Sequence, residues 1–363
     1  MTRRVLIVGA GLAGARCAET LRANGFEHKV TLLGAEPVPP YERPALSKEH
    51  LAGTRGAESL ELRPRGFWED NGIELLLGRR VLSVDAARRT ALTDSGEELA
   101  WDALVLATGA APRRLPGWDG HVLRTLADAA ALREQLRAGA RVAVIGAGFV
   151  GTEVASTALS LGAEVALVDV ARAPLERVLG PEVGSLLADR YAEAGIDLRL
   201  GAPVEPGELG ADLVVVAVGV APETVGVEGA NGIPTDACGR TALPGVYAAG
   251  DVAEAWHPVL GRRLRVEHWT SAAGQGAAVA HAILGEERPH SALPYFWSDQ
   301  FGLRLQYVGH AESWATVDLE GAPDSFVARY RDGGGVTVAA LAVNRPNEVG
   351  ALRNELAAMP LAA

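Results

Sequence analysis

A glycine-rich turn near the start of the chain constrains the fold more than any other feature. Residues 5–8 form an apolar run typical of a buried parallel strand, and a G-x-G-x-x-G motif follows at Gly9, Gly11 and Gly14. Between a strand and a helix, the first glycine allows a tight turn, the second lets the backbone approach a pyrophosphate, and the third lets helix and strand pack closely. The pyrophosphate charge lies at the helix N-terminus. The motif therefore predicts a dinucleotide-binding unit.

The unit occurs twice, each time with an acidic residue after its second strand. In the first unit, Glu36 follows a strand expected at residues 29–33 and is placed to accept hydrogen bonds from a ribose. A strand at residues 141–145 opens the second unit. Its glycines are Gly146, Gly148 and Gly151. Asp169 ends a strand at residues 164–168 and lies 18 residues after the last of these glycines, close to the usual offset of about 20.

Composition and charge exclude several classes of protein. The 363 residues suffice for two or three domains, and the hydrophobic fraction of 48% is that of a globular chain. A net charge of −11 argues against nucleic-acid binding, and no apolar stretch is long enough to span a membrane. Cys17 and Cys238 are the only cysteines and lie far apart, which fits a reducing compartment such as the cytoplasm. We expect no metal site.

The second half of the chain adds two further strand ends and a change of pattern. An apolar strand at residues 103–107 ends in Thr108, and a later one, after Gly245, ends in Asp251. A helix with small residues near its start is expected at residues 266–284. After it, strands are expected at residues 304–308, 325–330 and 336–342, with a final helix at residues 347–358. These elements predict a small α+β unit at the C-terminal end.

Two short stretches make a resemblance specific. Residues 41–48 are YERPALSK and residues 295–300 are YFWSDQ. Together with both glycine motifs, they resemble the glutathione reductase superfamily, and within it the oxygenase-coupled, NADH-dependent ferredoxin reductases that serve putidaredoxin-, rubredoxin- and Rieske-ferredoxin-type carriers. The resemblance implies an α/β fold with two Rossmann-like domains, one for FAD and one for NAD(H), plus the C-terminal domain. It implies the limits 1–114 with 240–292 for FAD, 115–239 for NAD(H), and 293–363 for the C-terminal α+β domain.

The resemblance also implies site residues. FAD contacts are expected from Gly9, Gly11, Gly14, Glu36, Arg43, Lys48, Thr108, Asp251 and Trp297. NAD(H) contacts are expected from Gly146, Gly148, Gly151, Asp169 and Trp269. Arg43 and Lys48 would lie along the flavin, and Glu153 would pair with Lys48 at the flavin–nicotinamide junction as the catalytic pair. Lys29 and Lys48 are the only lysines among 34 basic residues; the excess of arginine is either that of a GC-rich coding sequence or, at Lys48, the sign of a lysine that arginine cannot replace.

Several of these residues have a plain structural alternative. Glu153 lies in the first turn of its helix, where the helix dipole favours a carboxylate. Asp169 could cap a loop, although its position after a strand favours a ribose and thereby NADH over NADPH; Arg172 nearby could reach a 2′-phosphate. Trp269 could serve helix packing. The arginines at 79–80 and 262–265 are either solvated faces or a surface that steers an acidic ferredoxin.

The resemblance implies electron transfer from NADH through FAD to a ferredoxin-type iron–sulfur carrier of an oxygenase or a cytochrome P450. Residues 34–60 lack the cysteine that disulfide reductases and related peroxidases carry there, so electrons are expected to leave the flavin directly for an outside acceptor. Two alternatives stay open: reduction of a small molecule such as a quinone or oxygen, and a signalling flavoprotein like the apoptosis-inducing factors. We expect a monomer or a weak homodimer.

Overall fold

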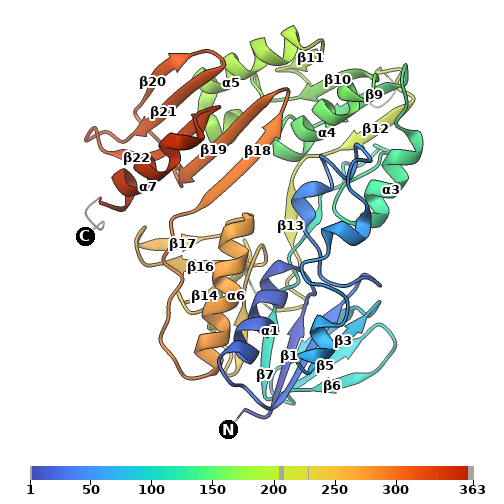
Figure 1. Ribbon diagram of the computed structural model, residues 1–363, viewed down its shortest axis with the longest axis vertical. Helices are drawn as coiled ribbons and strands as arrows, with labels where there is room; N and C mark the ends of the chain where they lie inside the picture. Colours follow the sequence, from blue (N-terminus) through green and yellow to red (C-terminus); the bar gives the residue numbers. More distant parts are fainter. Residues whose placement is uncertain (1, 204–207, 228, 359–363) are drawn as a thin grey trace.

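The computed structural model describes residues 2–203, 208–227 and 229–358, in which two parallel sheets, one five-stranded antiparallel sheet and three smaller sheets are combined with helices (Figure 1). The first sheet has the strand order β15-β7-β1-β2-β3 and is parallel throughout. Its strands are β1 (Arg4–Val8), β2 (Lys29–Gly34), β3 (Ile73–Leu77), β7 (Ala103–Leu106) and β15 (Val246–Ala248). The chain therefore leaves this sheet after β7 and returns to it with β15.

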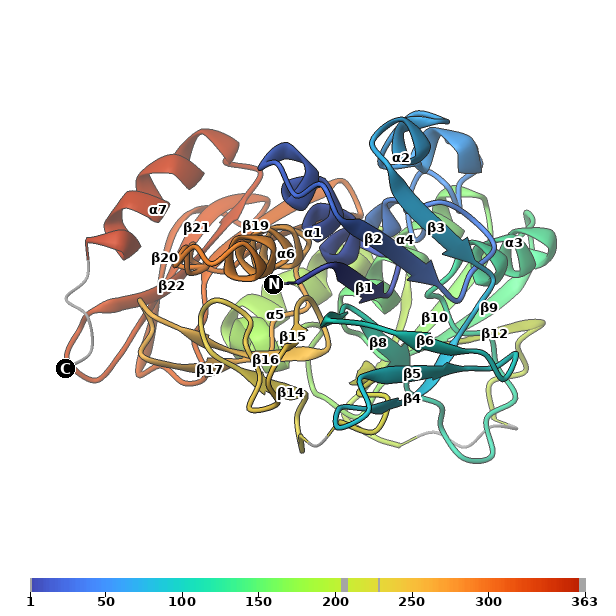
Figure 2. The same cartoon turned by 90° about the horizontal axis from the view of Figure 1, so that it is seen from below.

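The two faces of the first sheet are covered differently (Figure 2). Helices α1 (Leu12–Ala23) and α6 (Trp269–Ile283) pack on one face, and Gly276 of α6 lies so close to α1 that a Cβ there would stand 2.2 Å from the Ala13 carbonyl oxygen. The other face packs against two small sheets. They are β4 (Val81–Asp85), β5 (Thr90–Thr93) and β6 (Glu98–Ala100), and β14 (Ile233–Thr235), β16 (Ala253–His257) and β17 (Arg262–Leu264).

The second parallel sheet has the order β11-β10-β9-β12. Its strands are β9 (Arg141–Ile145), β10 (Glu164–Asp169), β11 (Asp197–Leu200) and β12 (Leu213–Val216), with helices α3 (Leu126–Gln135), α4 (Phe149–Ser160) and α5 (Glu176–Glu193). The backbone departs from helical geometry at Gly180 inside α5, directly before Pro181. The chain passes from the first parallel sheet to the second through β8 (Ala110–Pro112) and returns through β13 (Val220–Pro222). These two short strands pair as an antiparallel ribbon.

The C-terminal sheet is antiparallel, with the order β18-β19-β22-β21-β20 and helix α7 (Val349–Ala357). Its strands are β18 (Tyr295–Gln300), β19 (Leu303–Gly309), β20 (Thr316–Ala322), β21 (Ser325–Arg331) and β22 (Thr337–Val343). The strand β20 was not predicted from the sequence: it is an edge strand, it is almost entirely exposed, and its apolar alternation is limited to Val317 and Leu319.

One hydrophobic core joins the C-terminal sheet to the second parallel sheet. Val144 of β9 and Leu187 of α5 belong to the same buried cluster as Phe296 of β18 and Tyr330 of β21. The short elements complete the chain: 3₁₀ turns η1 (Arg43–Ala45), η2 (Ala57–Leu60) and η3 (Pro346–Glu348), and helix α2 (Phe67–Asp70).

The α/β architecture with a C-terminal α+β unit is confirmed. The helix expected at 266–284 begins instead at Trp269, because residues 265–268 belong to no helix or strand and His268, the N-cap, has an extended backbone. The predicted domain limits stay predictions; β14, on the 115–239 side of one limit, pairs with β16 on the other side.

Candidate functional site

A cleft of about 380 Å³ lies at the carboxyl ends of the first sheet's strands and is the candidate site. In the first sheet, β1 has β2 on one side and β7 on the other, so the crossovers run in opposite directions and open a crevice at this edge. Its walls come from both parallel-sheet units, because Val150 and Glu153 of α4 line it beside the glycine turn of the first unit. Volume and position are those of a small-molecule or cofactor site.

Both glycine turns have the backbone that the motif requires. Gly9 and Gly146 take φ angles of +117° and +106°, which only glycine adopts without strain. A Cβ at Gly14 would stand 2.1 Å from the Gly9 carbonyl oxygen, and one at Gly151 would stand 1.9 Å from that of Gly146. These glycines therefore allow each helix to begin directly against its strand.

The middle glycines face open space. A Cβ at Gly11 or Gly148 would meet no atom within 4 Å, and each residue is the N-cap of a helix without a side-chain cap. The free amides of these helix N-termini suit a pyrophosphate. In this respect the residues present fit two dinucleotides, one in each unit.

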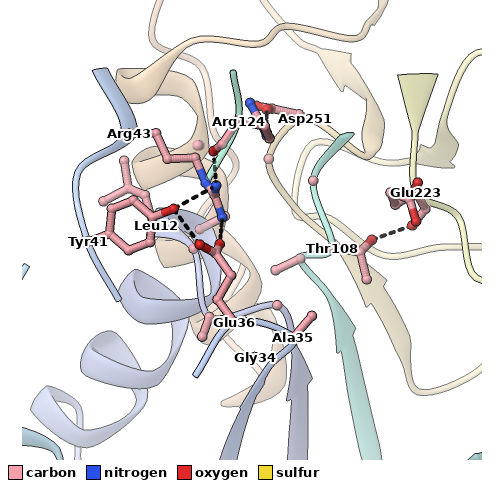
Figure 3. Close-up of a pocket in the computed structure, with 18 of the residues that line it drawn as sticks. Leu12, Gly34, Ala35, Glu36, Tyr41, Arg43, Thr108, Arg124, Glu223 and Asp251 are labelled. Atoms are coloured by element: carbon pink, nitrogen blue, oxygen red, sulfur yellow. Dashed lines mark hydrogen bonds and ion pairs between the residues drawn. The ribbon is translucent and has the colours of Figure 1, made fainter. Parts of the chain in front are cut away.

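Glu36, the predicted ribose acceptor, lies in the cleft within a network that also holds Arg43 (Figure 3). Arg43 Nη2 pairs with Glu36 Oε1 at 2.7 Å, and the Tyr41 hydroxyl donates to Glu36 Oε2 at 2.7 Å. Burial raises the pKa of Tyr41, so its hydroxyl keeps the proton that it donates. The network holds Arg43 beside Glu36; the predicted position of Arg43 along the flavin stays a prediction.

Asp251 lines the same cleft and forms an ion pair that the sequence did not indicate. Its Oδ2 accepts from Arg124 Nη2 at 2.7 Å, and the Arg124 carbonyl oxygen in turn accepts from Arg43 (Figure 3). Thr108 also lines the cleft, and its hydroxyl donates to the Glu223 carbonyl oxygen. Arg124 follows no motif and was missed, since only the folded chain brings it to a residue 127 positions away.

Lys48 and Glu153 form the buried ion pair that the resemblance implied. Lys48 Nζ lies 2.9 Å from Glu153 Oε1, with side-chain exposures of 12% and 8%. The Ser47 hydroxyl donates to Glu153 Oε2, so both carboxylate oxygens have a partner. Trp269 and Trp297 line the same cleft, with ring centroids 6.3 Å apart in an edge-to-face arrangement.

His268, the N-cap of α6, also lines this cleft. Its Nδ1 is buried without a hydrogen-bond partner among the described residues. Burial lowers the pKa of His268 to about 4, so the ring is neutral at pH 7. A neutral histidine with a free ring nitrogen can exchange a hydrogen bond with a bound group.

Asp169 makes the contacts expected of a residue that caps a loop, which was the alternative to ribose binding. One carboxylate oxygen accepts from the Ala147 amide at 2.6 Å and the other from the Ala171 amide at 2.8 Å. The carboxylate therefore fixes the glycine turn of the second unit to the end of β10. A carboxylate has further lone pairs, so the ribose contact stays a prediction beside this role.

The two cysteines are free and belong to no redox pair. Cys17 is fully buried in α1, and burial raises the pKa of its thiol. Cys238 lies in the turn after β14, near Glu287. Among the described residues, neither cysteine lines the cleft.

Most of the arginines considered for steering are paired with acids in the fold. Arg262 pairs with Glu312, and Arg265 pairs with Glu267 at 2.6 Å. In the group at residues 79–80, Arg79 pairs with Glu97 and Arg80 pairs with Glu223. These contacts favour the solvated-face interpretation for Arg262 and Arg265, whereas Arg79 and Arg80 line the cleft.

Two glycine turns, one shared cleft and a buried lysine–glutamate pair define a two-nucleotide oxidoreductase. Sequence comparison agrees: the family described as pyridine nucleotide-disulphide oxidoreductase matches residues 3–276, and a reductase C-terminal family matches residues 295–360. The chain belongs to the pyridine nucleotide-disulphide oxidoreductase family. Membership implies FAD and NAD(H) as its cofactors.

Individual relatives are similar along nearly the whole chain. The ferredoxin–NAD(+) reductase component of the anthranilate 1,2-dioxygenase system from Burkholderia cepacia is 38% identical and aligns with 97% of this chain and 94% of its own. Putidaredoxin reductase from Pseudomonas putida is 37% identical, with 95% and 89% covered. The solved covalent putidaredoxin reductase–putidaredoxin complex matches with a TM-score of 0.94 and 35% identity, covering 98% of this chain and 93% of the other.

The buried ion pair predicts a kinetic effect. We expect Lys48→Met to slow flavin reduction by NADH by on the order of 10²-fold, because Glu153 loses its counter-ion and the reactants lose their alignment. FAD should remain bound. Anaerobic stopped-flow absorbance measures the rate.

Lys29→Met is the matched control. Lys29, the only other lysine, pairs with Glu74 on the surface, with side-chain exposures of 59% and 45%. Its removal should leave the rate unchanged. Equal rates in the Lys48 variant and the wild type would refute the role of the pair.

Asp169 predicts the nucleotide preference. A carboxylate at this position repels a 2′-phosphate, so kcat/KM should favour NADH over NADPH by roughly tenfold or more. Steady-state rates with both nucleotides measure this ratio. A preference for NADPH would show that Arg172 dominates instead, and Arg172→Ala should then abolish that preference.

Proposed function

We propose that this protein is an FAD-containing, NADH-dependent reductase that passes electrons to a ferredoxin-type iron–sulfur carrier serving an oxygenase or a cytochrome P450. The observation that carries the proposal is the single cleft lined by both dinucleotide units, with Lys48, Glu153, Trp269 and Trp297 in its wall. The names of the relatives support the carrier, since they include ferredoxin–NAD(+), putidaredoxin and rubredoxin reductases.

The chain's own residues would hold two nucleotides in fixed relation. FAD, when bound, supplies the step from a two-electron hydride donor to single-electron transfer. Residues 1–114 and 240–292 would bind FAD and residues 115–239 would bind NAD(H). The proposed FAD residues are Gly9, Gly11, Gly14, Glu36, Arg43, Lys48, Thr108, Asp251 and Trp297. The proposed NAD(H) residues are Gly146, Gly148, Gly151, Asp169 and Trp269.

Lys48 and Glu153 would act at the junction of the two nucleotides. Their charges lie in the wall of a cleft from which a bound cofactor excludes water, where electrostatic interactions are stronger than in bulk solvent. Lys48 would supply a fixed positive charge, and Glu153 would hold it in place. No proton acceptor is required for hydride transfer from NADH, and His268, whose pKa burial lowers to about 4, is a weak base.

Direct electron transfer to an outside acceptor follows from the cysteines. Cys17 is buried in α1 away from the cleft, and Cys238 likewise does not line it. A disulfide relay beside the flavin therefore has no thiols to use. Free, buried cysteines also support a cytoplasmic setting, and we propose a monomer or a weak homodimer as the working form.

Among the described residues, no helix combines the length and the apolar character that crossing a bilayer requires.

The proposal predicts carrier-dependent turnover. NADH-driven cytochrome c reduction should be slow with the reductase alone and should rise at least roughly tenfold, and saturably, when a [2Fe–2S] ferredoxin is added. A transient partner that shuttles between two proteins gives this saturation. Cytochrome c absorbance measures the rate.

The alternatives give different outcomes in the same assay. Full-rate turnover with a quinone or oxygen, and no gain from ferredoxin, would show a small-molecule reductase. Very slow reoxidation of the reduced protein by every acceptor would indicate a signalling flavoprotein of the apoptosis-inducing-factor kind. Rubredoxin in place of ferredoxin distinguishes the two classes of carrier.

A further inference from the structure

The Glu153 carboxylate has a partner that the active-site cleft does not contain. Ser298 of β18 donates from Oγ to Glu153 Oε1 at 2.6 Å, the same oxygen that Lys48 Nζ approaches at 2.9 Å. Ser298 is fully buried and does not line the cleft, so it acts only on the carboxylate behind it. The C-terminal sheet therefore reaches the lysine–glutamate pair through a residue outside the cleft lining.

The direction of this hydrogen bond is fixed by two further residues. Gln300 Nε2, which can only donate, donates to Ser298 Oγ at 2.9 Å, so the Ser298 proton is left for Glu153. The Tyr191 hydroxyl donates to Gln300 Oε1 at 2.7 Å, which sets the orientation of that amide. Burial raises the pKa of Tyr191, so its hydroxyl remains a donor.

The three residues form a one-way chain of donors from α5 through β18 to α4. Tyr191 and Ser298 are fully buried and Gln300 is 3% exposed, so water does not compete for these bonds. In a low-dielectric interior each bond polarises the next, and a bond to an ionised acceptor is the stronger kind. The chain therefore presents a directed donor to a charged carboxylate.

We propose that Ser298, oriented by Gln300 and Tyr191, is a positioning residue that holds Glu153, and through it the Lys48 ammonium, at the nucleotide junction. The inference rests on the proposed function, because it assigns Ser298 a role in the site where NADH meets FAD. Without the Ser298 donor, the carboxylate charge is less neutralised. A more negative field in the cleft disfavours the addition of electrons to a bound flavin.

The test compares Ser298→Ala with Ser156→Ala in the FAD-loaded protein. Ser156 is the matched control: on the same helix α4, its Oγ accepts from the Phe301 amide at 2.7 Å, so it also ties α4 to the C-terminal segment, whereas the hydrogen bonds of Glu153 among the described residues go to Ser47 and Ser298. Ser298→Ala should shift the midpoint potential of the bound FAD to a more negative value. It should also lower the rate constant for flavin reduction by roughly tenfold, with a smaller effect on KM for NADH.

Ser156→Ala should leave the potential at the wild-type value. In a Glu153→Gln background, Ser298→Ala should produce no further shift, since its effect passes through the carboxylate. The proposal would be overturned if the wild type, Ser298→Ala and Ser156→Ala had equal potentials. It would also be overturned if Ser298→Ala still shifted the potential in the Glu153→Gln background.

Tyr191→Phe provides a second variant should Ser298→Ala fail to fold. It removes one hydroxyl at the far end of the chain and should shift the potential in the same direction by a smaller amount. A different result would refute the proposed function itself: NADH would not reduce the FAD of the wild-type protein. A reducible wild type whose Ser298 and Tyr191 variants keep its potential would refute this inference alone.

Discussion

The buried charge of Glu153 is the constraint on which the site depends. A carboxylate withdrawn from water is costly unless it is paired and hydrogen-bonded, and loss of one partner of a buried pair typically costs about 3–5 kcal/mol. Here the partners come from two parts of the chain, Lys48 and Ser47 from the first unit and Ser298 from the C-terminal sheet, and the carboxylate itself is on α4 of the second unit. Satisfying one charge therefore fixes the relative positions of all three units.

The two glycine turns are then held in a defined relation. The first sheet opens its crevice between β1 and β7, and α4 of the second unit contributes the facing wall. The C-terminal sheet shares its core with the second unit, so it supports that wall from behind. The arrangement brings both glycine-turn units to one cleft, and neither Cys17 nor Cys238 is among the described residues that line it, which is compatible with direct transfer to an external carrier.

Features that depend on a few neighbouring residues could be predicted from the sequence. The backbone at Gly9 and Gly146 follows from a motif a few residues long, and the Lys48–Glu153 pair followed from the family resemblance rather than from any pattern in the residues. Arg124 and Ser298 were missed as partners because each meets a carboxylate more than 100 positions away, which only the fold determines. Asp169 shows a further limit: its strand-end position was predicted, but its hydrogen bonds to two backbone amides were only an alternative.

The most direct measurement of the central claim is an anaerobic titration of the purified protein with NADH, followed by visible absorbance. Two nucleotide sites that meet at one junction predict a yellow protein that NADH bleaches, with a long-wavelength charge-transfer band from stacked nicotinamide and flavin rings. A colourless protein, or a yellow one that NADH leaves unbleached, would contradict the account.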